Sequence, residues 1–208
     1  MMSLDLDFEP WTRYAPLTQA RLSTVANMIR DVRRETVLLH EPTNGDSEWS
    51  LGCRVYSRTC HVLRVAAREY SWLTILEDDK LLRFAFAIGS IPIRFYHGEA
   101  DDPPNHYLMT TYAELHQQQL ALELGMVLLK DQILRLAVET DATRQVSNVT
   151  LVEMDEAKSL TGTYNIPFDI ELGNVTPLQS KGVDLPPLTL EPLKKDAEKR
   201  EKRDAGAK

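Results

Sequence analysis

Two histidines and three acidic residues lie within ten positions of one another in the segment HGEADDPPNH, residues 97–106. Imidazole nitrogens and carboxylate oxygens together bind zinc and other divalent ions. The candidate metal ligands are His97, Glu99, Asp101 and His106. A divalent metal would be the cofactor of such a site. The alternative is a solvated acidic loop, whose carboxylates favour the positive end of the helix that follows it.

A second acidic group, EDDK, follows the apolar run WLTIL at residues 77–80. A carboxylate, one residue and then a lysine end a common arrangement in metal-dependent nucleases. There the acids bind Mg²⁺ and the lysine orients or activates the attacking water. Glu77, Asp78 and Lys80 are therefore candidate catalytic residues. Such a site needs a further acid from a neighbouring strand, whereas the preceding element here is a helix, and a polar turn explains the same residues.

Three arginines form the third candidate site. Arg83, Arg94 and Arg135 each lie in an alternating run, on the side opposite its apolar residues, and Tyr96 shares the side of Arg94. Neighbouring guanidinium groups repel unless something negative lies between them. That group could be a carboxylate of the protein, such as Glu139, or an anionic ligand, which the planar guanidinium suits. These four residues are the candidate ligand-binding set, on a sheet face expected to be open to a partner.

The elements that would position these residues follow from the spacing of apolar side chains. Residues 18–39 carry them at intervals of three and four, which predicts a helix. Residues 47–70 do so over three heptads, at Trp49, Cys53, Tyr56, Cys60, Leu63, Ala67 and Tyr70. Strands cannot use this spacing, because their side chains alternate with a period of two. We expect two antiparallel helices joined by the segment 40–46, with the second stripe in the core.

Alternation with a period of two predicts the strands. Residues 72–76, 82–88 and 91–96 form a three-stranded antiparallel meander. A helix should begin at Asn105 and run to residue 124, and a second hairpin should pair 133–139 with 146–154. The stretch 155–175 is ambiguous, with one candidate strand at 168–172. The segregation of helices and antiparallel hairpins predicts an α+β fold.

The cysteines and the first residues suggest a compartment. Cys53 and Cys60 are the only cysteines. Seven residues of helix rise about 10.5 Å, whereas a disulfide needs Cα atoms within about 7 Å, so both are expected as buried free thiols in a reducing cytoplasm. The first fifteen residues carry three acids before the first arginine and do not resemble a secretory signal. No apolar run approaches the roughly 18–20 residues that a membrane helix needs.

Charge is distributed unevenly along the 208 residues. The net charge is −7, yet the segment 192–208 is basic, so the remainder is more acidic still. An acidic body repels phosphate at long range and argues against general binding of duplex nucleic acid. Four prolines between 177 and 192 precede the charged run. We therefore expect one α+β domain over residues 1–175 and a flexible tail over 176–208, extended at first and then charged and disordered.

Strong functional motifs are absent: the sequence holds no GxxxxGK[ST], GxGxxG, HExxH or GxSxG pattern and no EF-hand loop. This counts against the commonest forms of those classes, although not against enzymes with dispersed catalytic residues. The sequence favours a cytoplasmic, non-enzymatic binding or regulatory protein that recognises a partner protein or a small anionic ligand. The alternative is a metal-dependent hydrolase or nuclease that uses the 97–106 loop or the 77–80 turn.

Overall fold

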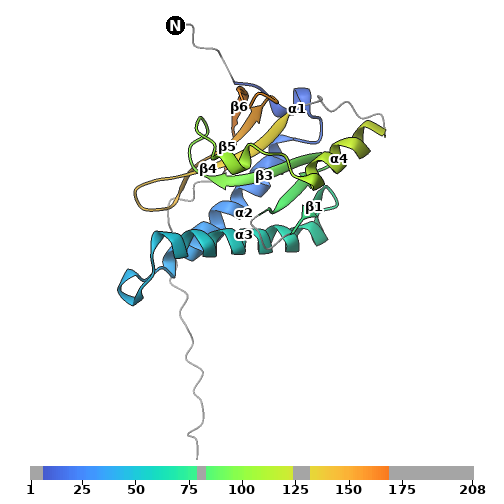
Figure 1. Cartoon of the computed structure of the whole chain (residues 1–208). Coiled ribbons are helices and arrows are strands. Elements are labelled where there is room, and N and C mark those ends of the chain that lie inside the picture. Colours follow the sequence, from blue (N-terminus) through green and yellow to red (C-terminus); the bar gives the residue numbers. More distant parts are fainter. Residues whose placement is uncertain (1–6, 79–82, 124–131, 169–208) are drawn as a thin grey trace, which may run out of the picture. The chain divides into compact units, whose positions relative to one another are not determined.

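The computed structural model describes residues 7–78, 83–123 and 132–168 (Figure 1). It confirms the α+β class. The predicted domain boundary at residue 175 and the predicted tail of residues 176–208 lie outside the described residues. Along the chain the elements are α1 (Pro10–Arg13), α2 (Gln19–Leu38), η1 (Pro42–Asn44), α3 (Glu48–Glu69), β1 (Leu73–Glu77), β2 (Ala85–Ile88), β3 (Ile91–His97), η2 (Asn105–Tyr107), α4 (Tyr112–Glu123), β4 (Ile133–Thr140), β5 (Val146–Met154) and β6 (Leu160–Asn165).

The two long N-terminal helices lie side by side (Figure 1). Helix α2 starts after Thr18, whose side chain accepts a hydrogen bond from the backbone N–H of Arg21. Helix α3 starts with a capping box, in which Ser47 and Ser50 each accept a hydrogen bond from the other's backbone N–H. Such caps satisfy N–H groups that the first helical turn leaves without partners. Both helices begin and end within one residue of the predicted positions.

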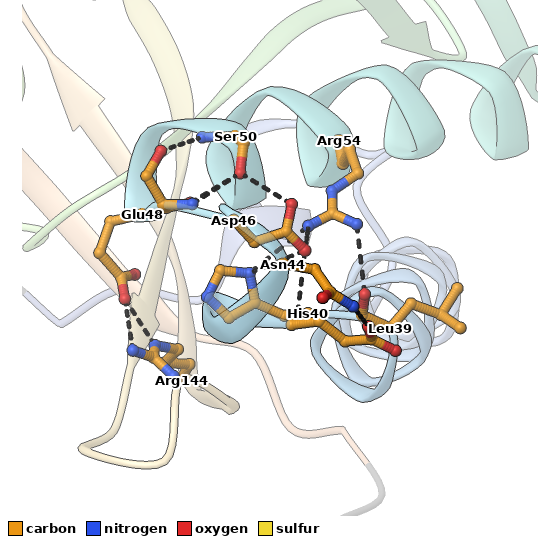
Figure 2. Close-up of polar contacts among 10 residues, drawn as sticks. Leu39, His40, Asn44, Asp46, Glu48, Ser50, Arg54 and Arg144 are labelled. Carbon is orange, nitrogen blue, oxygen red and sulfur yellow. Dashed lines mark hydrogen bonds and ion pairs between the residues drawn. The ribbon is translucent and has the colours of Figure 1, made fainter.

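A polar cluster holds the connection between α2 and α3 (Figure 2). Asp46 accepts a hydrogen bond from the backbone N–H of Glu41 at 2.9 Å and pairs with Arg54 at 2.6 Å. Gly45 adopts a left-handed φ of 94° at the end of η1, a conformation that glycine reaches without strain. The reversal of the chain is thus fixed by one turn and one ion pair.

The apolar stripe of α3 is only partly a core stripe. Cys60 and Leu63 are buried as predicted. Trp49 is 79% exposed, Cys53 is also exposed, and Tyr70 at the other end of the stripe is 37% exposed. The expectation of a fully buried stripe is therefore wrong at both ends, and that of two buried thiols is wrong for Cys53. The two cysteines are not bonded to each other. Trp49 and Cys53 line an open cleft, which accounts for their exposure.

The six strands form one sheet in the order β1-β2-β3-β4-β5-β6. Neighbours are antiparallel except β3 and β4, which are parallel. The prediction of a wholly antiparallel sheet is therefore wrong for the central pair, β3 and β4. Parallel neighbours need a long crossover connection, and the chain between His97 and Ile133, which contains α4, provides it. Helix α4 itself begins at Tyr112 and not at the predicted Asn105, because residues 105–107 form the separate turn η2.

The main core lies between the α2–α3 pair and one face of the sheet. Its largest side chains include Phe84, Phe86, Ile93, Phe95 and Leu136. A smaller cluster covers the other face, where Tyr96, Ala137, Val152 and Met154 pack with Tyr107 and Leu108. No helix among the described residues is both long enough and apolar enough to cross a membrane.

Candidate functional site

An apolar cleft of about 560 Å³ opens beside the N-terminal half of α3. Helix α3 lines it with Trp49 and Tyr56, and strand β3 contributes Phe95. Tyr107 from η2 and Val138 of β4 also line the cleft. Ligand sites in proteins are commonly concave, mostly apolar and of this volume.

The sequence of α3 explains why the cleft is open. Trp49, Gly52, Tyr56 and Thr59 follow one another at helical spacings of three and four, so they share one face of the helix. That face extends over about 15 Å along the helix axis. A Cβ placed on Gly52 would meet no atom within 4 Å. The space beside Gly52 is therefore open, and Gly52 lines the cleft together with Trp49 and Tyr56.

The part of the lining that Tyr107 forms is held in place by aromatic contacts. The Tyr107 ring lies 5.5 Å from that of Tyr96 and 4.0 Å from that of His106. The Arg94 guanidinium lies 4.9 Å from the centre of the Tyr107 ring. The Tyr96 hydroxyl donates to the backbone oxygen of Glu99 at 3.0 Å. Rings that are packed in this way form a wall that exists before any ligand arrives.

Arg33 is the buried cation of the cleft. It extends from α2, is 6% exposed, and donates from Nε to the backbone oxygen of Arg144 at 2.7 Å. Within the described part of the chain, its terminal nitrogens donate no hydrogen bond and no carboxylate forms an ion pair with it. Burial lowers the pKa of Arg33. The nearby carboxylate of Glu48 instead pairs with Arg144 at 2.5 Å (Figure 2).

Thr59 and His97 are further polar residues of the cleft. The hydroxyl of Thr59 is buried and has no hydrogen-bond partner among the described residues. His97 contacts Thr140 through Nε2 at 3.1 Å. The ring of His97 is exposed on one side, but desolvation by the surrounding atoms, and then the charge of Arg33, lower its pKa. His97 is therefore mainly neutral at pH 7 and adds a polar edge without a charge.

The candidate metal loop contributes its histidines to this cleft. His97 and His106 both line it. Glu99 and Asp101 are exposed. Within the described residues, no group of three or more histidine, cysteine, aspartate or glutamate side chains is arranged to hold a metal ion.

The second acidic group lies elsewhere. Asp78 accepts two hydrogen bonds from Arg64, each of 2.7 Å. Glu77 ends strand β1, and the candidate Lys80 lies outside the described residues. The structure thus gives Asp78 a partner in α3 and does not bring Glu77 or Asp78 to the cleft.

Arg94 and Arg135 do share one face, since they are partners in the parallel register of β3 and β4. They are 3% and 0% exposed, so the expectation of an open face is wrong. The segment from η2 into α4 covers them, and Glu114 of α4 pairs with Arg135 at 2.6 Å. Arg83 precedes β2 and is exposed.

The carboxylate that pairs with Arg135 comes from a residue that the sequence reasoning missed. Glu139 accepts a hydrogen bond from the backbone N–H of Ala100. Glu114 is the carboxylate that pairs with Arg135, and it also accepts from the N–H of Thr111 at 2.8 Å. The pattern Thr-x-x-Glu at 111–114 is a capping-box signature and could have revealed it.

Comparisons with protein-family models, with curated proteins and with solved structures give no match to this chain. The cleft combines aromatic surface, the buried cation of Arg33 and the hydroxyl of Thr59, which has no partner in the part of the chain that the structure describes.

Proposed function

We propose that this is a non-enzymatic binding protein whose cleft beside α3 takes a small organic ligand with a largely apolar body. The observation that carries the proposal is the helix face of Trp49, Gly52, Tyr56 and Thr59, which borders a cleft of about 560 Å³. Aromatic walls with a few fixed polar groups are the usual composition of a small-molecule site. Apolar burial would supply affinity, and the polar groups would supply orientation.

The cleft replaces the arginine face as the proposed ligand site. Arg94 and Arg135 already have protein partners and are covered by the chain. The cleft, in contrast, offers exposed aromatic surface at Trp49, and Thr59 and the terminal nitrogens of Arg33 have no hydrogen-bond partner among residues 7–78, 83–123 and 132–168. The cytoplasmic location expected from the sequence stays a prediction.

A neutral fluorescent probe tests this proposal. N-phenyl-1-naphthylamine fluoresces more strongly in apolar surroundings, and the full chain should bind it saturably with one site per chain. Gly52→Leu fills the open space beside Gly52 in the cleft, so we expect it to abolish binding. The same substitution replaces glycine in a helix, so it should raise stability by about 0.5–1 kcal/mol.

Ser57→Leu is the matched control, because it adds the same side chain to an exposed position of α3 that does not line the cleft. It should bind the probe as the unaltered chain does. Unchanged probe binding by Gly52→Leu, or equal loss in both variants, would contradict the proposed site.

A further inference from the structure

We infer that the ligand of the cleft is an organic anion, such as a carboxylate or sulfonate, whose charged group binds to the terminal nitrogens of Arg33. This inference rests on the proposed function and gives the ligand a chemical class. It follows from which groups of the cleft already have partners within the protein and which do not.

Arg33 is nearly buried, yet its charge is not balanced by a direct partner among the described residues. Burying a cation without an ion pair is costly, and proteins normally supply a carboxylate. The single hydrogen bond from Nε to the Arg144 backbone holds the guanidinium in one orientation. Its terminal N–H groups remain available at the cleft, where the fork geometry suits a carboxylate or sulfonate.

The charges of Glu48, Arg144 and Asp141 act on Arg33, but the two carboxylates have their hydrogen bonds with other groups. Glu48 is exposed and pairs with Arg144. Asp141 accepts hydrogen bonds from Thr143 and from the backbone N–H of Gln145. Arg33 is therefore the cationic group of the cleft that an incoming anion would meet.

Thr59 adds a second polar position on the α3 wall. A buried hydroxyl without a partner costs about 1–3 kcal/mol, and a polar atom of the ligand would remove that cost. The cleft thus pairs aromatic walls with Arg33 on α2 and Thr59 on α3. An apolar body with an anionic group and a further polar atom is complementary to this arrangement.

Two probes with the same rings separate this inference from the proposed function. N-phenyl-1-naphthylamine is neutral, whereas 8-anilinonaphthalene-1-sulfonate carries a sulfonate on the same skeleton. In the full chain, Arg33→Gln should weaken binding of the sulfonate by at least about tenfold, because hydrogen bonds to charged groups are the strong ones. It should change binding of the neutral probe by less than about twofold.

Arg30→Gln is the matched control, since Arg30 lies on the same helix, pairs with Asp31 and does not line the cleft. It should leave the affinities of both probes unchanged. Arg33→Lys keeps the charge without the fork and should weaken sulfonate binding less than Arg33→Gln does. Retained binding of the neutral probe shows that each variant keeps its cleft.

The outcomes are distinct. Binding of the neutral probe with no effect of Arg33→Gln on the sulfonate overturns the anion assignment and leaves the proposed function standing. Equal weakening of both probes by Arg33→Gln also overturns it, because Arg33 would then only support the fold. If the unaltered chain binds neither probe, the proposed function itself is overturned. This would be the result if another segment or a second copy of the chain filled the cleft.

Discussion

Replacing Glu114 by glutamine would remove the carboxylate that pairs with Arg135 in the described structure. Glu114 is 2% exposed, and its two oxygens accept hydrogen bonds from Arg135 and from the N–H of Thr111. Glutamine has the same length but only one acceptor oxygen, so if it keeps the bond from the Thr111 N–H, its NH2 group faces Arg135. The substitution therefore removes the charge and one hydrogen bond, and leaves Arg135 buried beside Arg94 with no carboxylate partner among the described residues.

The magnitude follows from the partners that remain. Removing one member of a buried ion pair costs about 3–5 kcal/mol. Arg135 also donates to the backbone oxygens of Tyr107, Leu134 and Met109, and these bonds moderate the loss, while the adjacent charge of Arg94 increases it. We therefore expect a loss of about 3–4 kcal/mol, a large fraction of the 5–15 kcal/mol typical of a folded domain.

Urea unfolding followed by circular dichroism measures this loss as a lower midpoint at an unchanged slope. Glu123→Gln, an exposed change on the same helix, should alter the free energy of unfolding by less than about 0.5 kcal/mol. The double variant Glu114→Gln with Arg135→Met should lose less than the sum of the two single losses. A loss below about 1 kcal/mol for Glu114→Gln alone would refute the account of a desolvated pair.

Three further predictions concern packing, thiol access and acid stability. Leu63→Ala should lower the free energy of unfolding by about 2–5 kcal/mol, because Leu63 is fully buried; a loss below about 0.5 kcal/mol in urea would contradict this packing. A maleimide should label Cys53 in the native protein and Cys60 only in denaturant, because Cys60 is buried and burial raises its thiol pKa to about 12. Mass spectrometry detects the labelled cysteine, and rapid labelling of Cys60 in the native protein would contradict this prediction. Hydrogen bonds from the Glu41 backbone and then from Arg54 lower the pKa of Asp46 below its usual value of 3.8. The ionised Asp46 therefore stabilises the folded state above pH 3.8, and this stabilisation is lost as the pH falls through the lowered pKa. Asp46→Asn should therefore show a smaller fall in Tm below pH 3.8, and identical profiles of Tm against pH would argue against this role.

The long helices could be predicted from the sequence because their evidence is local. The stripe from Trp49 to Tyr70 has a period that only a helix can satisfy, and Ser47 marks its start. Strand β6 was missed within the ambiguous stretch, where Gly162 and polar residues interrupt any alternation. The parallel pairing of β3 with β4 was also missed, because strand direction depends on the path of the crossover and not on the residues of either strand.

The burial of the candidate site residues could be predicted only in part. Periodicity shows which face of a helix is apolar, but not what covers that face, so Trp49 and Cys53 were placed in the core. Alternation placed Arg94 and Arg135 on one face correctly, but whether a later segment covers that face depends on tertiary structure. Arg33 lies at the edge of the apolar face of α2, one turn from Ile29, and only the folded chain shows that it is buried.

The parallel pairing at the centre of the sheet has a consequence for how the protein folds. Strands β1–β3 and β4–β6 each form from neighbours in sequence, whereas β3 and β4 meet only after the long crossover closes, which costs loop entropy before any contact is gained. The cleft takes Phe95 from the first group and Val138 from the second. The complete cleft therefore forms only when strands β1–β3 and β4–β6 have joined into one sheet. A ligand bound in the cleft would slow the separation of these two groups of strands and so lower the rate of unfolding.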